Sequence, residues 1–184
     1  CVDLYAGTTW VLRDPLFVYA IEAGVTLTTL LLLADIGQVD DAGSLALALT
    51  ALAVASIHLE RALAPEGTFS RVRFGLPLFW SGHAQLGASL LILLASQTLG
   101  WLVEAFGIAV PENRLIRSDL LAGGLWIAAT YLYLYSDLVV RRVGLYMYLA
   151  GASLLMAEVT LILPHLSHEG LIIVLATTGV LLQV

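Results

Sequence analysis

The feature that most constrains this chain is a series of long apolar runs, three of which open with the same signature. In each, an Arg is followed by Pro or Gly after two residues, by Leu after three and by an aromatic residue after six. The copies begin at Arg13, Arg73 and Arg142, at spacings of 60 and 69 residues. Because one membrane crossing takes about 20 residues, each interval holds two helices. The sequence predicts a helical hairpin repeated about three times, with units 13–72, 73–141 and 142–184.

Composition indicates the class of protein. Hydrophobic residues make up 60% of the 184 residues and charged residues only 12%, a balance that exceeds what a soluble domain of this size can bury. We therefore predict an all-α, polytopic membrane bundle of about six transmembrane helices in a single transmembrane domain. The apolar runs place these helices at 15–36, 42–63, 76–102, 120–140, 144–163 and from about 171 onward.

The last apolar run is shorter than a membrane crossing. Residues 171–184 would extend about 21 Å as a helix, against a hydrocarbon core of about 30 Å. We expect this run to be truncated, re-entrant or completed by residues outside the sequence, and we interpret the chain as a fragment of a longer protein.

Several functional classes are disfavoured by residue types. All eight basic residues are Arg and Lys is absent, which excludes a lysine Schiff base or a P-loop lysine within this segment. The net charge of −6 and the lack of a basic, aromatic face argue against nucleic-acid binding. Hydrolase motifs are also absent, so no enzyme activity is predicted. The expected partners are the lipid bilayer and further helices of the same chain or of other membrane subunits.

The distribution of Arg predicts the orientation in the membrane. Six Arg fall on one side of the expected helices and two on the other, and the Arg-rich side is cytoplasmic by the positive-inside rule. The six are Arg13, Arg61, Arg71, Arg73, Arg141 and Arg142; the two are Arg114 and Arg117. The N-terminus is therefore predicted to be cytoplasmic, and the short loops favour a bacterial inner membrane.

Four ionisable residues are predicted at similar depth. Counted along their helices, Glu22, His58, His83 and Asp137 lie within roughly 5 to 11 Å of the same membrane face, and Gln85 lies beside them. Lipid does not solvate such groups, so they must find partners or a water-filled cavity. They predict a path for protons or a small solute, with Glu22 and His83 changing protonation and the others lining the site.

Other interpretations of the same residues remain open at this point. His83 and Gln85 could form structural hydrogen bonds between helices, with the acids reaching the headgroups or buried as neutral groups. Alternatively, His58 and His83 could be the two axial ligands of a b-type haem in a redox subunit. A third interpretation is a membrane anchor or assembly scaffold of a larger protein. No cofactor is predicted outside the haem alternative.

A short loop offers a weak metal-binding pattern. His165, His168 and Glu169 are three metal-capable side chains within five residues. A structural or catalytic zinc needs further ligands, and none is evident nearby in the sequence. A solvated loop explains the same residues.

Overall fold

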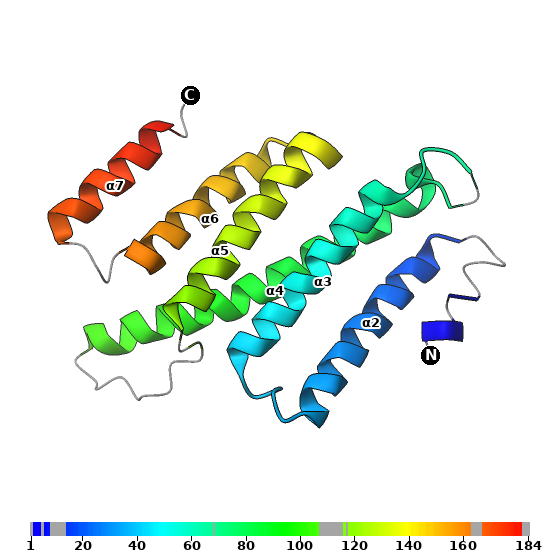
Figure 1. Cartoon of the computed structure of the whole chain (residues 1–184), viewed down its shortest axis with the longest axis horizontal. Helices are drawn as coiled ribbons and strands as arrows, with labels where there is room; N and C mark the ends of the chain where they lie inside the picture. Colours follow the sequence, from blue (N-terminus) through cyan, green and yellow to red (C-terminus); the bar gives the residue numbers. More distant parts are fainter. Residues whose placement is uncertain are drawn as a thin grey trace. The chain divides into compact units, whose positions relative to one another are not determined.

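The computed structural model describes residues 2–4, 6–7, 14–67, 69–106, 116, 118–162 and 167–181. Within these ranges the regular elements are all helical (Figure 1). They are α2 (Leu16–Asp35), α3 (Ala42–Ala62), α4 (Arg71–Ala105), α5 (Asp119–Tyr135), the π-helical η1 (Ser136–Val140), α6 (Leu145–Ile162) and α7 (His168–Leu181). The contacts divide the chain into unit 1, Cys1–Ile92, and unit 2, Leu93–Val184, and α4 contributes to both.

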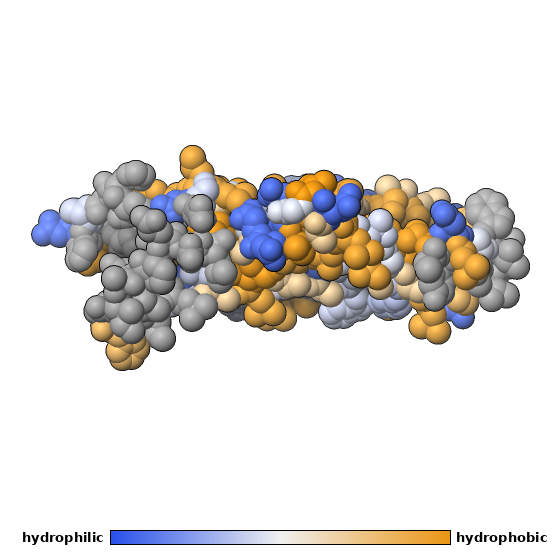
Figure 2. Space-filling view, turned by 90° about the horizontal axis from the view of Figure 1, so that it is seen from below, coloured by the Kyte–Doolittle hydropathy of each residue, from blue (hydrophilic) through white to orange (hydrophobic). Residues whose placement is uncertain are grey.

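The helices indicate an integral membrane protein. Among the described residues, four segments are long and apolar enough to cross a membrane: α2, α3, Arg71–Thr98 of α4, and α6. Their outward surfaces carry large apolar side chains, such as Leu31, Leu91 and Met147, and hydrophobic residues cover much of the face seen in Figure 2. Such surfaces are costly in water and suited to lipid. The predicted all-helical character is confirmed for the described residues, and four of the helical segments meet the length and hydropathy that a membrane crossing requires.

The first two helices begin and end close to the predicted residues because their termini carry strong local signals. Asp14 Oδ1 accepts the Leu16 amide at 2.9 Å, and Asp41 Oδ2 accepts the Ser44 amide at 2.8 Å. These side chains satisfy amides that a helix N-terminus leaves open. Gly37, at φ +70°, ends α2 in the left-handed region where glycine has no Cβ penalty.

α4 begins earlier than predicted. It starts at Arg71 rather than at residue 76, so Pro77 lies inside the helix. The Phe74 amide already donates to the Ser70 carbonyl at 2.9 Å. Pro77 has no N–H, so it cannot continue the usual bond to the residue four positions earlier. Proline and glycine in the repeated signature therefore do not mark the first turn of this helix.

The helix predicted at 120–140 has two parts. α5 starts at Asp119 with Ser118 Oγ accepting the Leu121 amide at 3.2 Å, and regular α-helix ends at Tyr135. Residues Ser136–Val140 continue as η1, and the Arg141 amide donates to the Ser136 carbonyl at 2.7 Å. The last predicted helix, expected near residue 171, begins at His168.

In unit 1, α3 and α4 pack closely through small residues. Gly75, Gly82 and Ser89 recur every seven residues along α4, a spacing that returns to the same helix face. A Cβ built on Gly82 would lie 2.7 Å from Ile57 Cγ1 and 3.2 Å from the Ala53 carbonyl oxygen. The two backbones therefore approach as small residues allow in membrane bundles.

Hydroxyls strengthen the same contact. Thr50 on α3 and Ser89 on α4 are hydrogen-bonded at 2.8 Å, and Ser89 Oγ also donates to the Ala46 carbonyl at 2.8 Å. Both side chains are buried. α2 lies beside α3 and antiparallel to it (Figure 1), but Val18 is its only residue classed as buried.

In unit 2, α5 and α6 pack against each other with a glycine at their contact. A Cβ on Gly123 would overlap the side chain of Leu161. Gln97 of α4 joins both helices: its Nε2 donates to Thr160 Oγ1 at 2.8 Å, and Trp126 Nε1 donates to its Oε1 at 3.1 Å. One amide side chain thus satisfies groups on two helices.

The contact between α3 and α4 gives a matched pair of substitutions. We expect Gly82→Ala to lower the Tm of the full chain in detergent, because a gain in helix propensity of about 1 kcal/mol is outweighed by an overpacking cost of about 1 to 3 kcal/mol. Gly87→Ala, on the same helix but with nothing within 4 Å of the added Cβ, should leave the Tm unchanged or raise it. Equal Tm changes in both variants would contradict the close packing at Gly82.

Candidate functional site

Glu22 is an acidic side chain of α2 that accepts hydrogen bonds from side chains of α3 and α4. Its carboxylate lies on α2 and is half-buried. Ser56 Oγ, on α3, donates to Glu22 Oε2 at 2.8 Å, and Gln85 Nε2, on α4, donates to the same oxygen at 3.3 Å. Glu22 and Gln85, which the sequence places at similar depth, are therefore joined by a direct hydrogen bond.

Gln85 is held in one orientation by its neighbours. The Thr26 hydroxyl donates to the Glu22 main-chain carbonyl at 2.8 Å, so it is free to accept, and Gln85 Nε2 donates to it at 2.9 Å. Ser56 Oγ also lies 3.5 Å from Gln85 Oε1. Gln85 is buried, and a buried amide with defined partners fixes the positions of the groups around it.

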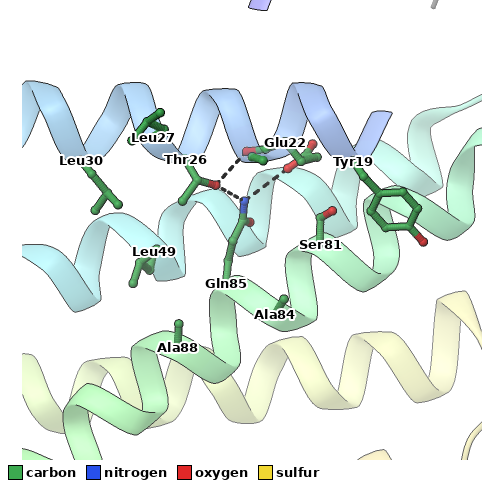
Figure 3. A pocket seen from close by; sticks show the side chains of 11 residues that line it. Tyr19, Glu22, Thr26, Leu27, Leu30, Leu49, Ser81, Ala84, Gln85 and Ala88 are labelled. Carbon is green, nitrogen blue, oxygen red and sulfur yellow. Dashed lines mark hydrogen bonds between the residues drawn. The ribbon is translucent and has the colours of Figure 1, made fainter. Parts of the chain in front are cut away.

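A groove of about 420 Å³ runs beside this network. Its lining comes from one face of α2, one face of α4 and a single residue of α3 (Figure 3). The lining residues are Tyr19, Glu22, Ala23, Thr26, Leu27 and Leu30 of α2, Leu49 of α3, and Ser81, Ala84, Gln85 and Ala88 of α4. The spacings of three and four along α2 and α4 place each set on a single helix face.

The charge of Glu22 is not neutralised by a cation among the described residues. Its two side-chain partners are a hydroxyl and a neutral amide, and both bonds end on Oε2. Oε1 accepts no hydrogen bond from a described residue, and Glu22 is part of the groove lining. A carboxylate with one oxygen held by the protein and the other left open can exchange a proton or bind a cationic group.

The two histidines predicted to belong to the site, His58 and His83, lie outside the groove lining. The Nδ1 atoms of His58 and His83 lie 2.8 Å from the carbonyl oxygens of Val54 and Phe79 on their own helices. Each histidine lies two positions from a network residue, Ser56 or Gln85, which is about 200° around a helix. Neither ring lines the groove, so the predicted set is divided between helix faces.

Asp137 belongs to unit 2, where its position explains a local turn. Its Oδ1 accepts the Val143 amide at 2.7 Å, which connects η1 to the residues preceding α6. The side chain is buried. Accepting an amide that the helix start leaves unpaired is a structural role that explains a carboxylate at this position. The predicted grouping of Asp137 with Glu22 stays a prediction.

The predicted metal loop is only partly within the described residues. His165 lies outside them, and Glu169 is an exposed residue in the first turn of α7. Within the described ranges no three His, Cys, Asp or Glu side chains are grouped as metal ligands would be. The set of His165, His168 and Glu169 stays a prediction from sequence.

Two residues of the network were not singled out from the sequence. Thr26 follows Glu22 by four positions, one helical turn, which is a detectable signal for a shared face. Ser56 gives no such signal, because its contact with Glu22 depends on how α3 is rotated against α2. Spacing along one helix was informative, whereas rotation between helices was not available from the sequence.

Comparison of the chain with protein-family models, with curated proteins and with solved structures finds no match. The site is therefore interpreted from its own geometry.

The role of Gln85 in holding α2 against α4 can be tested, with Gln97 of α4 as the control. We expect Gln85→Leu to increase amide hydrogen exchange across α2, because the bonds to Thr26 and Glu22 are lost and α2 has little other burial. Gln97→Leu should instead increase exchange in α5 and α6, whose side chains Gln97 contacts. Exchange would be measured by mass spectrometry on the full chain in lipid nanodiscs. Unchanged exchange of α2 in Gln85→Leu would show that the network does not hold this helix.

Proposed function

We propose that this chain is a membrane transport domain in which Glu22 takes up and releases a proton along a path for protons or a small solute. The observation that supports the proposal is the convergence of Ser56 and Gln85 on one oxygen of Glu22, at the edge of a groove. Ionisable groups within membrane helices are expensive and are a functional-site hypothesis by default. Here the carboxylate is oriented by side chains of two other helices, and no described residue pairs it with a cation.

Both protonation states of Glu22 fit the same geometry. The carboxylate accepts from Ser56 and Gln85 through Oε2, and the protonated acid keeps Oε2 as an acceptor while its O–H extends from Oε1. No rearrangement of Gln85 is needed, since its amide is held by Thr26 as well. A proton can therefore arrive at and leave Oε1 while the supporting hydrogen bonds persist.

The proposed domain has a defined topology. It comprises about six membrane helices in repeated hairpins, with the N-terminus in the cytoplasm of a bacterial cell and the chain in the inner membrane. The four apolar spans and the Arg distribution support this arrangement. α5 followed by η1, and α7, would be the remaining crossings.

Proton flux through vesicles tests the role of Glu22. We expect Glu22→Gln to reduce proton flux in proteoliposomes, driven by a potassium diffusion potential and followed with an internal pH dye, to the level of protein-free vesicles. Glu22→Asp should retain part of the flux because a titratable group remains. Glu66→Gln, which changes an exposed acid between α3 and α4, is the control and should keep the full flux. Wild-type flux in Glu22→Gln, with an unchanged Tm, would refute the mechanism.

The orientation has its own test. With Cys1 replaced by Ser, single cysteines at Asp40 and Glu66 lie in the connections on either side of α3. We expect a membrane-impermeant maleimide to label Asp40→Cys in intact cells, and Glu66→Cys only after the cells are opened. The reverse pattern would place the N-terminus outside the cytoplasm.

A further inference from the structure

The groove beside Glu22 has two chemically different ends. Tyr19, Glu22 and Ser81 line one end together with Gln85, and Leu27, Leu30, Leu49 and Ala88 line the other (Figure 3). Its volume of about 420 Å³ falls within the 300–1,000 Å³ typical of small-molecule sites. The shape and chemistry therefore match a small amphiphile with a polar head and an apolar body.

We propose that this groove binds a lipophilic cation, an amine or quaternary ammonium with an apolar body, whose charge lies against Glu22. The proposal rests on the proposed function, because it uses the same carboxylate and names the solute that exchanges with the proton. The head would occupy the end at Tyr19 and Glu22, and the body would lie along the leucines.

The sign of the ligand charge follows from the residues around the head. Oε1 of Glu22 accepts no hydrogen bond from a described residue, and neither Ser56 nor Gln85 carries charge. No basic side chain is among the described residues that line the groove. An anion would face this carboxylate without compensation, and an apolar chain alone would leave it unsolvated. A cation satisfies the carboxylate, and the Tyr19 ring, one turn away, can stabilise it further.

The exchange with a proton is balanced in atoms and charge. When the cation enters, the O–H bond of protonated Glu22 breaks, the proton leaves to water, and the carboxylate pairs with the ligand. The proton forms a new O–H bond with a water molecule, and no other covalent bond changes. Because one carboxylate serves both partners, cation and proton compete, which is the elementary requirement for exchange of one against the other.

A chemical footprint of Glu22 tests the ligand class. The full chain in phosphatidylcholine nanodiscs would be treated with dicyclohexylcarbodiimide, which modifies protonated carboxyl groups in apolar surroundings, and labelling would be measured by mass spectrometry. We expect decyltrimethylammonium to slow the labelling of Glu22, whereas decanol and decyl sulfate do not. Glu158 of α6, whose Oε1 is bonded by Thr178 in unit 2, is the internal control and should label at the same rate throughout.

A pair of substitutions locates the apolar body. Ala88→Phe narrows the apolar end of the groove and should weaken protection by about 5- to 150-fold, as overpacking costs of about 1 to 3 kcal/mol imply. Ala51→Phe places the same side chain at an exposed position of α3 outside the groove lining and should leave protection unchanged. Equal effects of the two variants would overturn the assignment of the body to this groove.

Each remaining outcome is decisive. Protection by decanol as strong as by the cation would identify an acyl chain as occupant, and concentration-dependent loss of labelling without ligand would identify a second copy of this chain; both overturn the proposal. Absence of protection by any probe, with Glu22-dependent proton flux intact, would remove the cation site while leaving the proposed function standing. Loss of the Glu22 dependence of flux would instead remove the proposed function itself.

Discussion

The organisation of unit 1 depends on one amide side chain, Gln85, and the acid that it contacts. α3 and α4 hold each other through glycine contacts and buried hydroxyls, but α2 has Val18 as its only residue classed as buried. In a membrane, apolar surface gives no hydrophobic preference for a neighbouring helix over lipid. The bonds from Gln85 to Thr26 and Glu22, with the bond from Ser56, act together with the packing of Val18 against Phe74 and Leu78 of α4 to position α2.

A glutamine side chain also joins helices in unit 2, but the side chains that it contacts there are neutral. Gln97, twelve residues after Gln85 on α4, also reaches two side chains, but both are neutral: Thr160 and Trp126. That arrangement is satisfied as it stands and supports packing of α5 and α6. The network in unit 1 instead includes a carboxylate with an open oxygen beside a groove. The contacts of Gln97 therefore have a structural role, whereas the Glu22 carboxylate is the group at which we propose that a proton or a ligand binds.

The sequence was sufficient for features encoded locally and insufficient for those that depend on rotation between helices. Asp41 and Gly37 mark helix ends through their own side-chain or backbone chemistry, and the predicted ends lie within a residue or two. The start of α4 was predicted too late, because the helix begins at Arg71 and contains Pro77. Depth along a helix identified Glu22 and Gln85 as neighbours, yet it grouped them with His58 and His83, which lie on other faces.

Placing the carboxylate on the least buried helix has an energetic consequence for the proposed mechanism. Three side-chain hydrogen bonds connect α2 to its neighbours, and such bonds average about 0.6 kcal/mol each within membranes. Their sum is about 2 kcal/mol, to which the packing of Val18 against Phe74 and Leu78 of α4 adds. Protonation weakens two of the three, since bonds to a charged acceptor are stronger than bonds to a neutral one. In the proposed mechanism, a proton on Glu22 would therefore loosen the contacts that position α2 without breaking them, because the carboxylate that exchanges the proton is also the acceptor of two of these hydrogen bonds.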